Sequence, residues 1–183
     1  MLGNEILKEI YEVLKQIDHK QIDELIHTIM KDTKTRIFVT GCGRTGYIMR
    51  SFAMRLNHLG LTTYFVGDTV TAEAGQGDIL IIGSGSGETD SLICYSKKAK
   101  ELGMKCILFS TRKSNTLAEM ADITVVLQSG SKYELLNRED SIQPMGALFE
   151  QSLMILLDSI VLEIMRAYQI SNETMFSRHA NLE

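Results

Sequence analysis

The chain has 183 residues, of which 44% are hydrophobic and 23% are charged, and its formal net charge is -4 at pH 7. This length suits one domain with a sizeable core, the acidic balance excludes the basic footprint of a nucleic-acid-binding protein, and no apolar run is long enough to cross a membrane. The N-terminus lacks a signal-peptide pattern, and three cysteines without CxxC spacing predict neither a disulfide framework nor a zinc site, so we expect a cytoplasmic protein.

Two amphipathic helices are predicted at the N-terminus, within residues 4–30. Apolar residues recur at helical spacing over residues 4–17 and again over residues 22–30. Asp18 stands before the second helix and Gln21 follows three residues later, a spacing that resembles a capping box. We expect both helices to be packing elements.

Strand-like and helix-like segments alternate between residues 36 and 128. The expected strands are residues 36–40, 62–66, 78–82, 105–110 and 123–127. Helices are expected at residues 47–59, from the end of the third strand's turn to residue 102, and at 114–121, with Gly60 and Gly103 ending the first two. Because parallel strands are joined by crossing helices, this pattern predicts an α/β fold: a three-layer α/β/α sandwich with a five-stranded parallel sheet.

The C-terminal part is expected to hold a loop, a long helix and a tail. Residues 129–143 are polar and form a stretch that is long for a compact domain, so we predict a functional loop. The helix, residues 145–168, is apolar on most faces and is followed by a tail at 171–183. We expect a second subunit to bury part of this helix; the alternative is a central core helix of one chain. We interpret residues 1–183 as a single domain.

Two glycine-rich turns follow the first and third predicted strands. The first, GCGRTG at residues 41–46, is a literal GxGxxG, and with Asp68 after the next strand it matches a dinucleotide-binding fingerprint. The second, GSGSGET at residues 83–89, can present backbone N–H groups, a helix N-terminus and the hydroxyls of Ser84, Ser86 and Thr89 to one anion. The alternative for the second turn is a flexible loop without a ligand.

The relative position of the two turns favours a phosphorylated small molecule over a dinucleotide. In a parallel sheet of order 2-1-3-4-5 the strand order reverses between the first and third strands, so both turns face one crevice. Gly43 and Arg44 would then lie beside a phosphate held by the second turn. The alternative for Arg44 is a surface or interface ion pair. A nicotinamide-dependent enzyme would also need a separate catalytic domain, for which the chain has no room.

Other catalytic and metal-binding templates do not match. The serines of the second turn lack GxSxG spacing, no P-loop motif occurs, and the four histidines show no paired spacing. We therefore predict no metal site and no cofactor. Cys42 is most simply a small filler between glycines, and the start of a helix explains Glu88 as well as catalysis does.

Several segments together resemble one known family. VTGCGRTG at residues 39–46, IIGSGSGET at 81–89, SIQPMGALFEQ at 141–151 and MFSRHANLE at 175–183 are similar to the 6-phospho-3-hexuloisomerases of the sugar isomerase (SIS) family. The resemblance covers nearly the whole chain, although the loop at residues 68–77 lacks the family's proline and glutamate. It implies a flavodoxin-like parallel sheet and a homotetramer with active sites at subunit interfaces.

The resemblance also implies an activity and its residues. The activity is isomerisation of D-arabino-hex-3-ulose 6-phosphate to fructose 6-phosphate, within the ribulose monophosphate route of formaldehyde fixation. Glu150 matches the family's proposed base, and burial would raise its basicity; the alternative is a buried carboxylate paired with an arginine. His179 matches the candidate for proton shuttling or sugar handling, reaching a neighbouring subunit's site; the alternative is a surface residue of the tail.

Two functions of other classes stay open on the sequence. A non-catalytic SIS sensor would bind the same sugar phosphate, although a DNA-binding segment usually accompanies such sensors and we find none. A nicotinamide-binding oxidoreductase would use the GxGxxG turn at residues 41–46 and would reveal itself by binding that cofactor.

Overall fold

A computed structural model describes residues 1–129 and 141–182 of the chain. The strands are β1 (Ile37–Gly41), β2 (Thr63–Phe65), β3 (Ile79–Gly83), β4 (Lys105–Ser110) and β5 (Ile123–Val126). The helices are α1 (Leu2–Leu14), α2 (His19–Met30), α3 (Gly43–Leu59), α4 (Asp90–Glu101), α5 (Thr116–Met120), α6 (Ala147–Ala167) and α7 (Asn172–Phe176). Most of the polar loop predicted at residues 129–143 lies outside the described residues.

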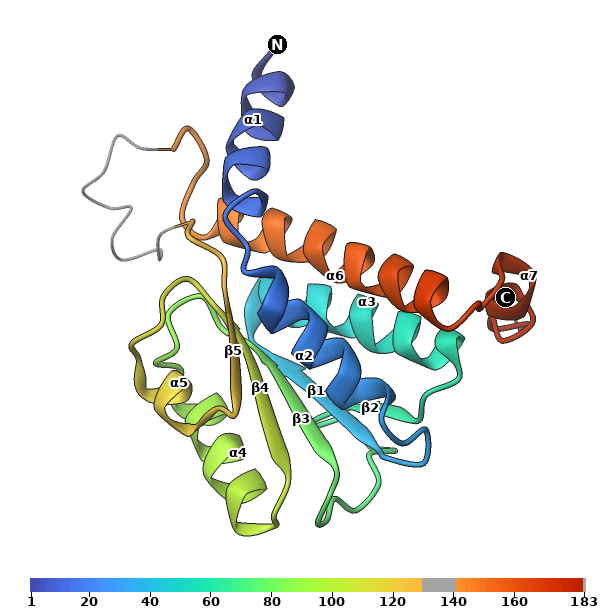
Figure 1. The fold of residues 1–183 in the computed structure, drawn as a ribbon. Helices are drawn as coiled ribbons and strands as arrows, with labels where there is room; N and C mark the ends of the chain where they lie inside the picture. The colour runs from blue at the N-terminus through green and yellow to red at the C-terminus, as the bar shows by residue number, and fades with distance from the viewer. Residues whose placement is uncertain (130–140, 183) are drawn as a thin grey trace.

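The five strands form one parallel sheet in the order β2-β1-β3-β4-β5, which confirms the predicted topology. Helices α2, α3 and α6 cover one face, and α4 and α5 cover the other (Figure 1). The strand order reverses between β1 and β3, whose carboxyl ends lie side by side because Gly41 is in register with Gly83. A ligand site is expected at this point of such a sheet.

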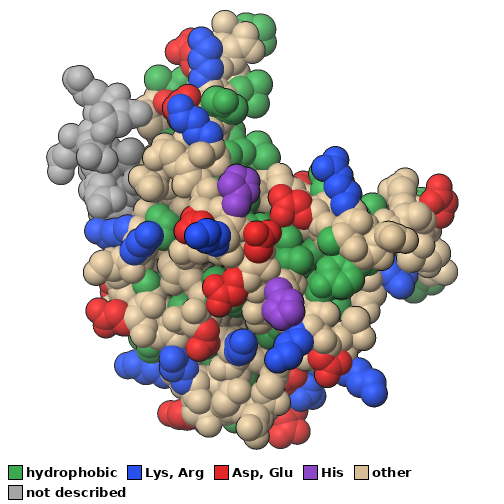
Figure 2. Space-filling view, in the orientation of Figure 1, with side chains coloured by type: hydrophobic (Ala, Val, Ile, Leu, Met, Phe, Trp, Pro, Cys, Tyr) green, Lys and Arg blue, Asp and Glu red, His purple; other side chains and the backbone are tan. Residues whose placement is uncertain are grey.

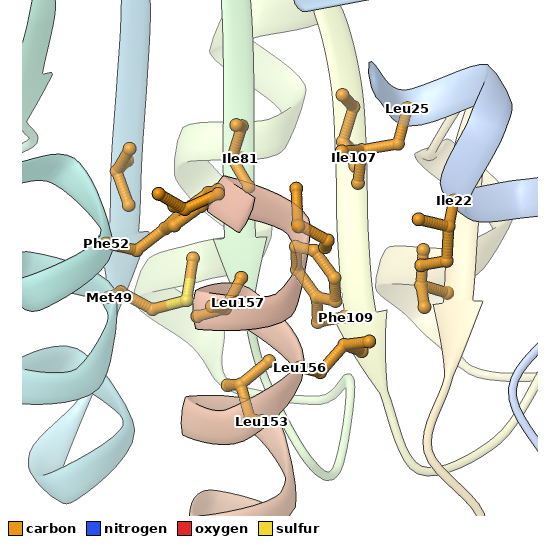
Figure 3. Packing of buried hydrophobic residues seen from close by; sticks show 14 of the residues in the cluster. Ile22, Leu25, Met49, Phe52, Ile81, Ile107, Phe109, Leu153, Leu156 and Leu157 are labelled. Atoms are coloured by element: carbon orange, nitrogen blue, oxygen red, sulfur yellow. The ribbon is translucent and has the colours of Figure 1, made fainter. Parts of the chain in front are cut away.

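Alternation along the strands divides the buried apolar residues into two clusters. In β3, Ile79 and Ile81 belong to the cluster with α2, α3 and α6, whereas Leu80 and Ile82 belong to the cluster with α4 and α5. Figure 3 shows part of the first cluster, where side chains from the sheet meet those of three helices: Ile22, Leu25, Met49, Phe52, Ile81, Ile107, Phe109, Leu153, Leu156 and Leu157.

Helix α6 is the central helix of the first cluster. Ten of its residues are buried within the chain, on most faces of the helix. Ile155 and Leu162 stay 40% and 53% exposed. The chain itself therefore buries most of the apolar residues of this helix, and Ile155 and Leu162 are its most exposed large hydrophobic residues.

Most element ends follow the predicted signals. Asp18 caps α2 by accepting a hydrogen bond from the N–H of Lys20 at 3.0 Å. Gly60 ends α3 in the left-handed conformation, with φ at 95°. The short helix α7 in the C-terminal tail was not predicted; Ser171 caps it by accepting a hydrogen bond from the N–H of Thr174.

The turn predicted at residues 41–46 is wrong, because α3 already begins at Gly43. Cys42 is extended and serves as the N-cap residue, so the helix starts almost directly from the end of β1. Gly46 makes this possible, since a Cβ atom there would lie 2.6 Å from the carbonyl oxygen of Gly41. The third glycine of the motif thus serves close packing between helix and strand.

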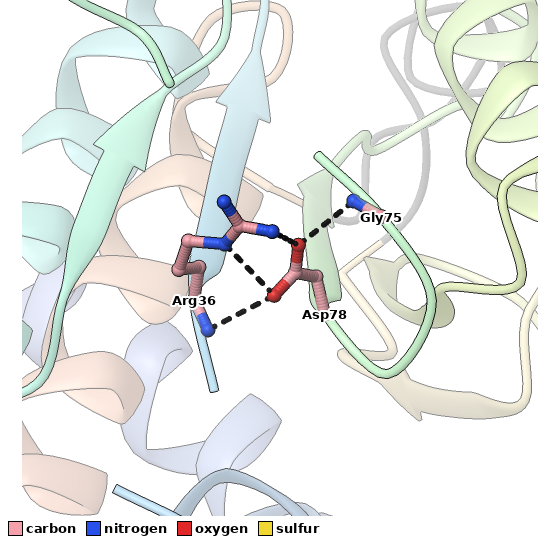
Figure 4. Close-up of polar contacts among 3 residues, drawn as sticks. All are labelled: Arg36, Gly75 and Asp78. Carbon is pink, nitrogen blue, oxygen red and sulfur yellow. Dashed lines mark hydrogen bonds and ion pairs between the residues drawn. The ribbon is translucent and has the colours of Figure 1, made fainter. Parts of the chain in front are cut away.

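A partly buried ion pair between Arg36 and Asp78 ties the start of β1 to the start of β3 at the amino-terminal edge of the sheet (Figure 4). Asp78 accepts hydrogen bonds from the Arg36 side chain, at 3.2 Å from Nε and 2.8 Å from Nη2, and from the backbone N–H groups of Arg36 and Gly75. Burial raises the pKa of Asp78, but these hydrogen bonds outweigh it and hold the pKa below its ordinary value. The Asp78 carboxylate is therefore fully hydrogen-bonded, and its pairing with Arg36 stabilises the fold.

Helix α1 projects from the rest of the molecule and packs against α6 (Figure 1). Ile10 and Val13 are buried, while Leu7 and Tyr11 are 60% and 65% exposed. Figure 2 shows hydrophobic side chains among charged ones along this projecting helix, and charged side chains of both signs over the rest of the visible face. Within the described ranges, no helix has the length and apolar character needed to cross a membrane.

Candidate active site

A cavity of about 430 Å³ opens at the carboxyl edge of the sheet, where the strand order reverses. The loops after β1, β3 and β4 line it, together with the start of α6 and the residues just before it. Its volume lies within the range typical of small-molecule sites. Six of the seven predicted site residues line this one cavity: Gly43, Arg44, Ser84, Ser86, Thr89 and Glu150.

Internal hydrogen bonds hold the turn after β3 in place. The Oγ atom of Ser84 accepts a hydrogen bond from the N–H of Gly87 at 3.2 Å. The Oγ atom of Ser86 accepts one from the N–H of Glu88 at 3.3 Å. Because both serine oxygens act as acceptors in these contacts, their hydroxyl protons can be donated to an anion in the cavity.

Three helices, α3, α4 and α6, begin at this cavity without a side-chain cap. Their N-cap residues are Cys42, Thr89 and Gly146, none of which makes a capping hydrogen bond, whereas side chains cap α2, α5 and α7. The first N–H groups of a helix have no partner inside it and carry partial positive charge. Three such helix starts around one cavity favour a negatively charged ligand.

Arg44 and Glu150 form an ion pair at the cavity, with 3.0 Å between Nη1 and Oε2. The Arg44 side chain is 62% exposed, whereas that of Glu150 is only 16% exposed. Burial raises the pKa of Glu150 above its ordinary value, and the charge of Arg44 offsets only part of this effect. A carboxylate with a raised pKa is a stronger base than one in water, so the cavity contains a group able to accept a proton.

His179 does not line this cavity within the chain. It lies beyond α7, where the centroid of its ring is 5.4 Å from that of the His58 ring. Glu150 stands in the first turn of α6, while His179 follows the other end of that helix, which is about 25 Å away at 1.5 Å per residue (Figure 1). A contact between His179 and such a cavity would therefore need a second copy of the chain.

Two other acidic residues noted in the sequence serve elsewhere. Glu88 accepts hydrogen bonds from the hydroxyl and N–H of Thr116, at 2.6 and 2.9 Å, and these bonds hold its pKa below the ordinary value. Asp68 pairs with Arg50 at 2.8 Å. Neither Asp68 nor any other residue of the loop at residues 68–77 lines the cavity. The acidic residue that a dinucleotide site would need is thus engaged away from the cavity.

Thr111 and Met145 are among the lining residues that the sequence analysis did not single out. Thr111 follows β4, and its hydroxyl donates a hydrogen bond to the carbonyl oxygen of Gly85 at 2.7 Å. Its place at the carboxyl end of the strand beside β3 is a signal that could have found it. Met145 has a φ of 52°, which is uncommon for a residue other than glycine, and no pattern in the sequence indicates it.

Comparison with known proteins supports this picture of the fold. A 3-hexulose-6-phosphate isomerase of Bacillus subtilis is 38% identical over 179 residues, which cover 98% of this chain and 96% of the relative. A protein of that name from Methanocaldococcus jannaschii is 41% identical over 163 residues, covering 88% and 84%. A crystal structure from Methanococcus jannaschii, from which a molecular function of 3-hexulose-6-phosphate isomerase was inferred, matches with a TM-score of 0.86 and 36% identity over 100% of both chains. The SIS domain model matches residues 29–155, and the chain therefore belongs to the SIS domain family.

Proposed function

We propose that this chain is a sugar-phosphate isomerase that interconverts D-arabino-hex-3-ulose 6-phosphate and fructose 6-phosphate. The cavity at the carboxyl edge of the sheet carries the proposal, because a turn rich in hydroxyl and N–H donors and a largely buried carboxylate of raised pKa lie in it together. The names of the similar proteins support the same substrate. The reaction would belong to the ribulose monophosphate route of formaldehyde fixation, in the cytoplasm.

The proposed reaction moves a ketone from C3 to C2 of the sugar. The Glu150 carboxylate takes the proton from C2, and the electron pair of that bond forms a 2,3-enediolate as the C3 oxygen gains charge. Return of the proton to C3, with transfer of the C2 hydroxyl proton to the C3 oxygen, leaves the carbonyl at C2. Electrons move only within the substrate, so the step balances without an oxidant or reductant.

The phosphate is assigned to the turn after β3 in this proposal. Ser84, Ser86 and Thr89 would donate hydroxyl hydrogen bonds to it, and Gly43 and Arg44 would lie beside it at the start of α3. Anchoring the phosphate fixes one end of the sugar, so that C2 and C3 are presented to Glu150 instead of diffusing past it. Arg44 already touches Glu150 and would lie between the phosphate and the base.

An NMR assay tests the proposal. Purified protein is incubated with fructose 6-phosphate, and the 3-ketose is expected to appear in the spectrum until equilibrium is reached. Exchange of the C3 proton of fructose 6-phosphate for solvent deuterium should accompany the reaction, since the base shares protons with water. Binding of fructose 6-phosphate without interconversion would replace the proposal with the sensor, and binding of a nicotinamide cofactor in a parallel titration would favour the oxidoreductase.

We also propose that the protein is a homotetramer in which His179 reaches the site of another subunit. The exposed apolar residues on α1 and α6, Leu7, Tyr11, Ile155 and Leu162, support burial against further copies of the chain. Native mass spectrometry gives the subunit number directly. Mixing Glu150→Gln with His179→Ala subunits then tests sharing, because mixed tetramers would regain activity only if one site draws residues from two chains.

A further inference from the structure

Glu9 of α1 holds the segment that leads into one wall of the cavity. Its Oε1 accepts a hydrogen bond from the N–H of Ile142 at 2.9 Å. Its Oε2 accepts hydrogen bonds from the Ser141 hydroxyl at 2.9 Å and from the side-chain amide of Gln143 at 2.8 Å. Partial burial raises the pKa of Glu9, but these three hydrogen bonds outweigh it and keep the pKa below its ordinary value. The carboxylate therefore stays ionised, with its partners bound, at neutral pH.

Gln143 extends this contact from α1 to α6. It is only 6% exposed, and its Oε1 accepts a hydrogen bond from the side-chain amide of Gln151 at 2.6 Å. Gln151 is the residue after Glu150, near the start of α6. A chain of hydrogen bonds thus runs from Glu9 through Gln143 to the helix turn that carries the proposed base.

The cavity wall between Gln143 and α6 contains a strained residue. Met145 has a φ of 52°, a left-handed conformation that a non-glycine residue keeps only where its surroundings hold it. On its C-terminal side, the N–H of Ala147 donates to the carbonyl oxygen of Pro144 at 3.1 Å. On its N-terminal side, the hydrogen bonds to Glu9 fix residues 141–143, so both flanks of the wall are held.

We propose that Glu9 is a positioning residue, which holds residues 141–143, fixes the cavity wall at residues 144–146 and thereby sets the place of Glu150 beside Arg44. The wall includes Gly146, the N-cap residue of α6, and the N–H of Glu150 bonds to the Gly146 carbonyl oxygen at 3.0 Å. A shift of the wall therefore shifts the first turn of α6 and the carboxylate with it. This inference rests on the proposed function, in which Glu150 is the base.

The test compares Glu9→Ala with wild type in three measurements: kcat in the isomerase assay, affinity for inorganic phosphate by calorimetry, and titration of the Glu150 carboxyl by carbon-13 NMR. Loosening the wall should hydrate Glu150 and lower its apparent pKa toward that of an exposed glutamate. We expect kcat to fall about ten- to a hundredfold, as misplacement of a catalytic group does. Phosphate affinity should stay within about twofold, because the turn after β3 does not contact Glu9.

Glu12→Ala is the matched control, since Glu12 lies on the same helix and forms an exposed ion pair with Lys15; all three measurements should match wild type. Gln143→Leu breaks the same chain of hydrogen bonds at its middle and should repeat the Glu9→Ala changes, which keeps the test available if Glu9→Ala does not fold. The inference would be overturned if the apparent pKa of Glu150 in these variants equalled that in wild type. It would also be overturned if phosphate affinity fell as much as kcat. If wild type shows no isomerase activity, the proposed function fails, while the titration still decides the role of Glu9.

Discussion

The two edges of the sheet each carry an arginine–carboxylate pair, and the pairs differ in how completely the carboxylate is satisfied. At the amino-terminal edge, Asp78 receives four hydrogen bonds and its pKa lies below the ordinary value. At the carboxyl edge, Glu150 meets Arg44 at a single contact of 3.0 Å and its pKa lies above the ordinary value. Burial raises the pKa of both carboxylates, so the number of hydrogen-bond donors decides whether the pKa lies above or below its ordinary value.

This difference separates stability from reactivity within one sheet. A carboxylate that is surrounded by donors gains nothing by taking a proton, and its ionised form supports the folded state. A carboxylate that is buried with few donors favours protonation, which suits a base and weakens the folded state at neutral pH. Substitutions at the two pairs should therefore have opposite effects on activity and on stability.

The largest effect is expected for Glu150→Gln at the carboxyl edge. Removal of the base should lower kcat by about 10²- to 10⁴-fold, the usual contribution of general acid–base catalysis. The shape of the side chain is kept, so binding of inorganic phosphate should persist. Glu163→Gln on the exposed side of the same helix is the control and should keep full activity. Undiminished kcat in Glu150→Gln would remove the role of Glu150 as base.

At the amino-terminal edge, Asp78→Asn should affect stability instead. The substitution leaves Arg36 without its charged partner, and we expect the free energy of unfolding to fall by about 2–3 kcal/mol, less than for a fully buried pair because the Arg36 side chain is 39% exposed. Urea unfolding measures this change. Well below the unfolding midpoint, kcat should match wild type. A large loss of kcat in the folded variant would contradict the separation of the two edges.

Arg44→Gln should weaken substrate binding and strengthen the base at once. Loss of a charge beside the phosphate should raise KM by about tenfold, in line with the loss of one charge-assisted hydrogen bond. Loss of the same charge removes the factor that lowers the pKa of Glu150, so the acid limb of the pH–rate profile should move to higher pH. Arg55→Gln is the control, because Arg55 lies on α3 like Arg44 but faces Asp158 of α6, at 4.0 Å. This substitution should change neither KM nor the acid limb. An unmoved acid limb would show that Arg44 does not act on the base.

The smallest effect concerns stability as a function of pH. The pKa of Glu150 is raised on folding, so the unfolded state releases this proton first and stability falls as the pH rises through that interval. Glu150→Gln should therefore be more stable than wild type at pH 7, and this gain should vanish below the ordinary pKa of a glutamate. Asp78 has a lowered pKa, so its contribution is present above the ordinary pKa of an aspartate and is lost in acid. Urea midpoints at several pH values measure both trends.

Patterns that are local in the sequence predicted most of the fold. Apolar spacing and glycine positions indicated the strands and helices, and the alternation of strands with helices indicated the parallel sheet that Gly41 and Gly83 join in register. The start of α3 was placed too late, because a GxGxxG motif reads as a turn until the packing of Gly46 against β1 is known. The tail also hid α7, since a helix of five residues has too few positions to show a period.

The site was predictable only where a motif marks it. The glycines and hydroxyl residues of the turn at residues 83–89 indicate a site for an anion. Glu150 was identified by its place in a family segment, not by any local property. The contact of Glu9 with residues 141–143 joins positions more than 130 residues apart, and no periodicity or motif connects them. The sign of the Glu150 pKa likewise depends on how many donors the fold brings near, which spacing along the chain does not encode.

Because α3, α4 and α6 begin without side-chain caps, the stability of this protein should depend on the concentration of its phosphosugar. Side chains of the protein cap the starts of α2, α5 and α7, whereas an anion in the cavity would complete the starts of α3, α4 and α6. A ligand that binds the folded state alone raises the free energy of unfolding by RT ln(1 + [L]/Kd). Cells rich in the phosphosugar would then protect the enzyme from unfolding and proteolysis, and cells that lack it would clear the enzyme sooner.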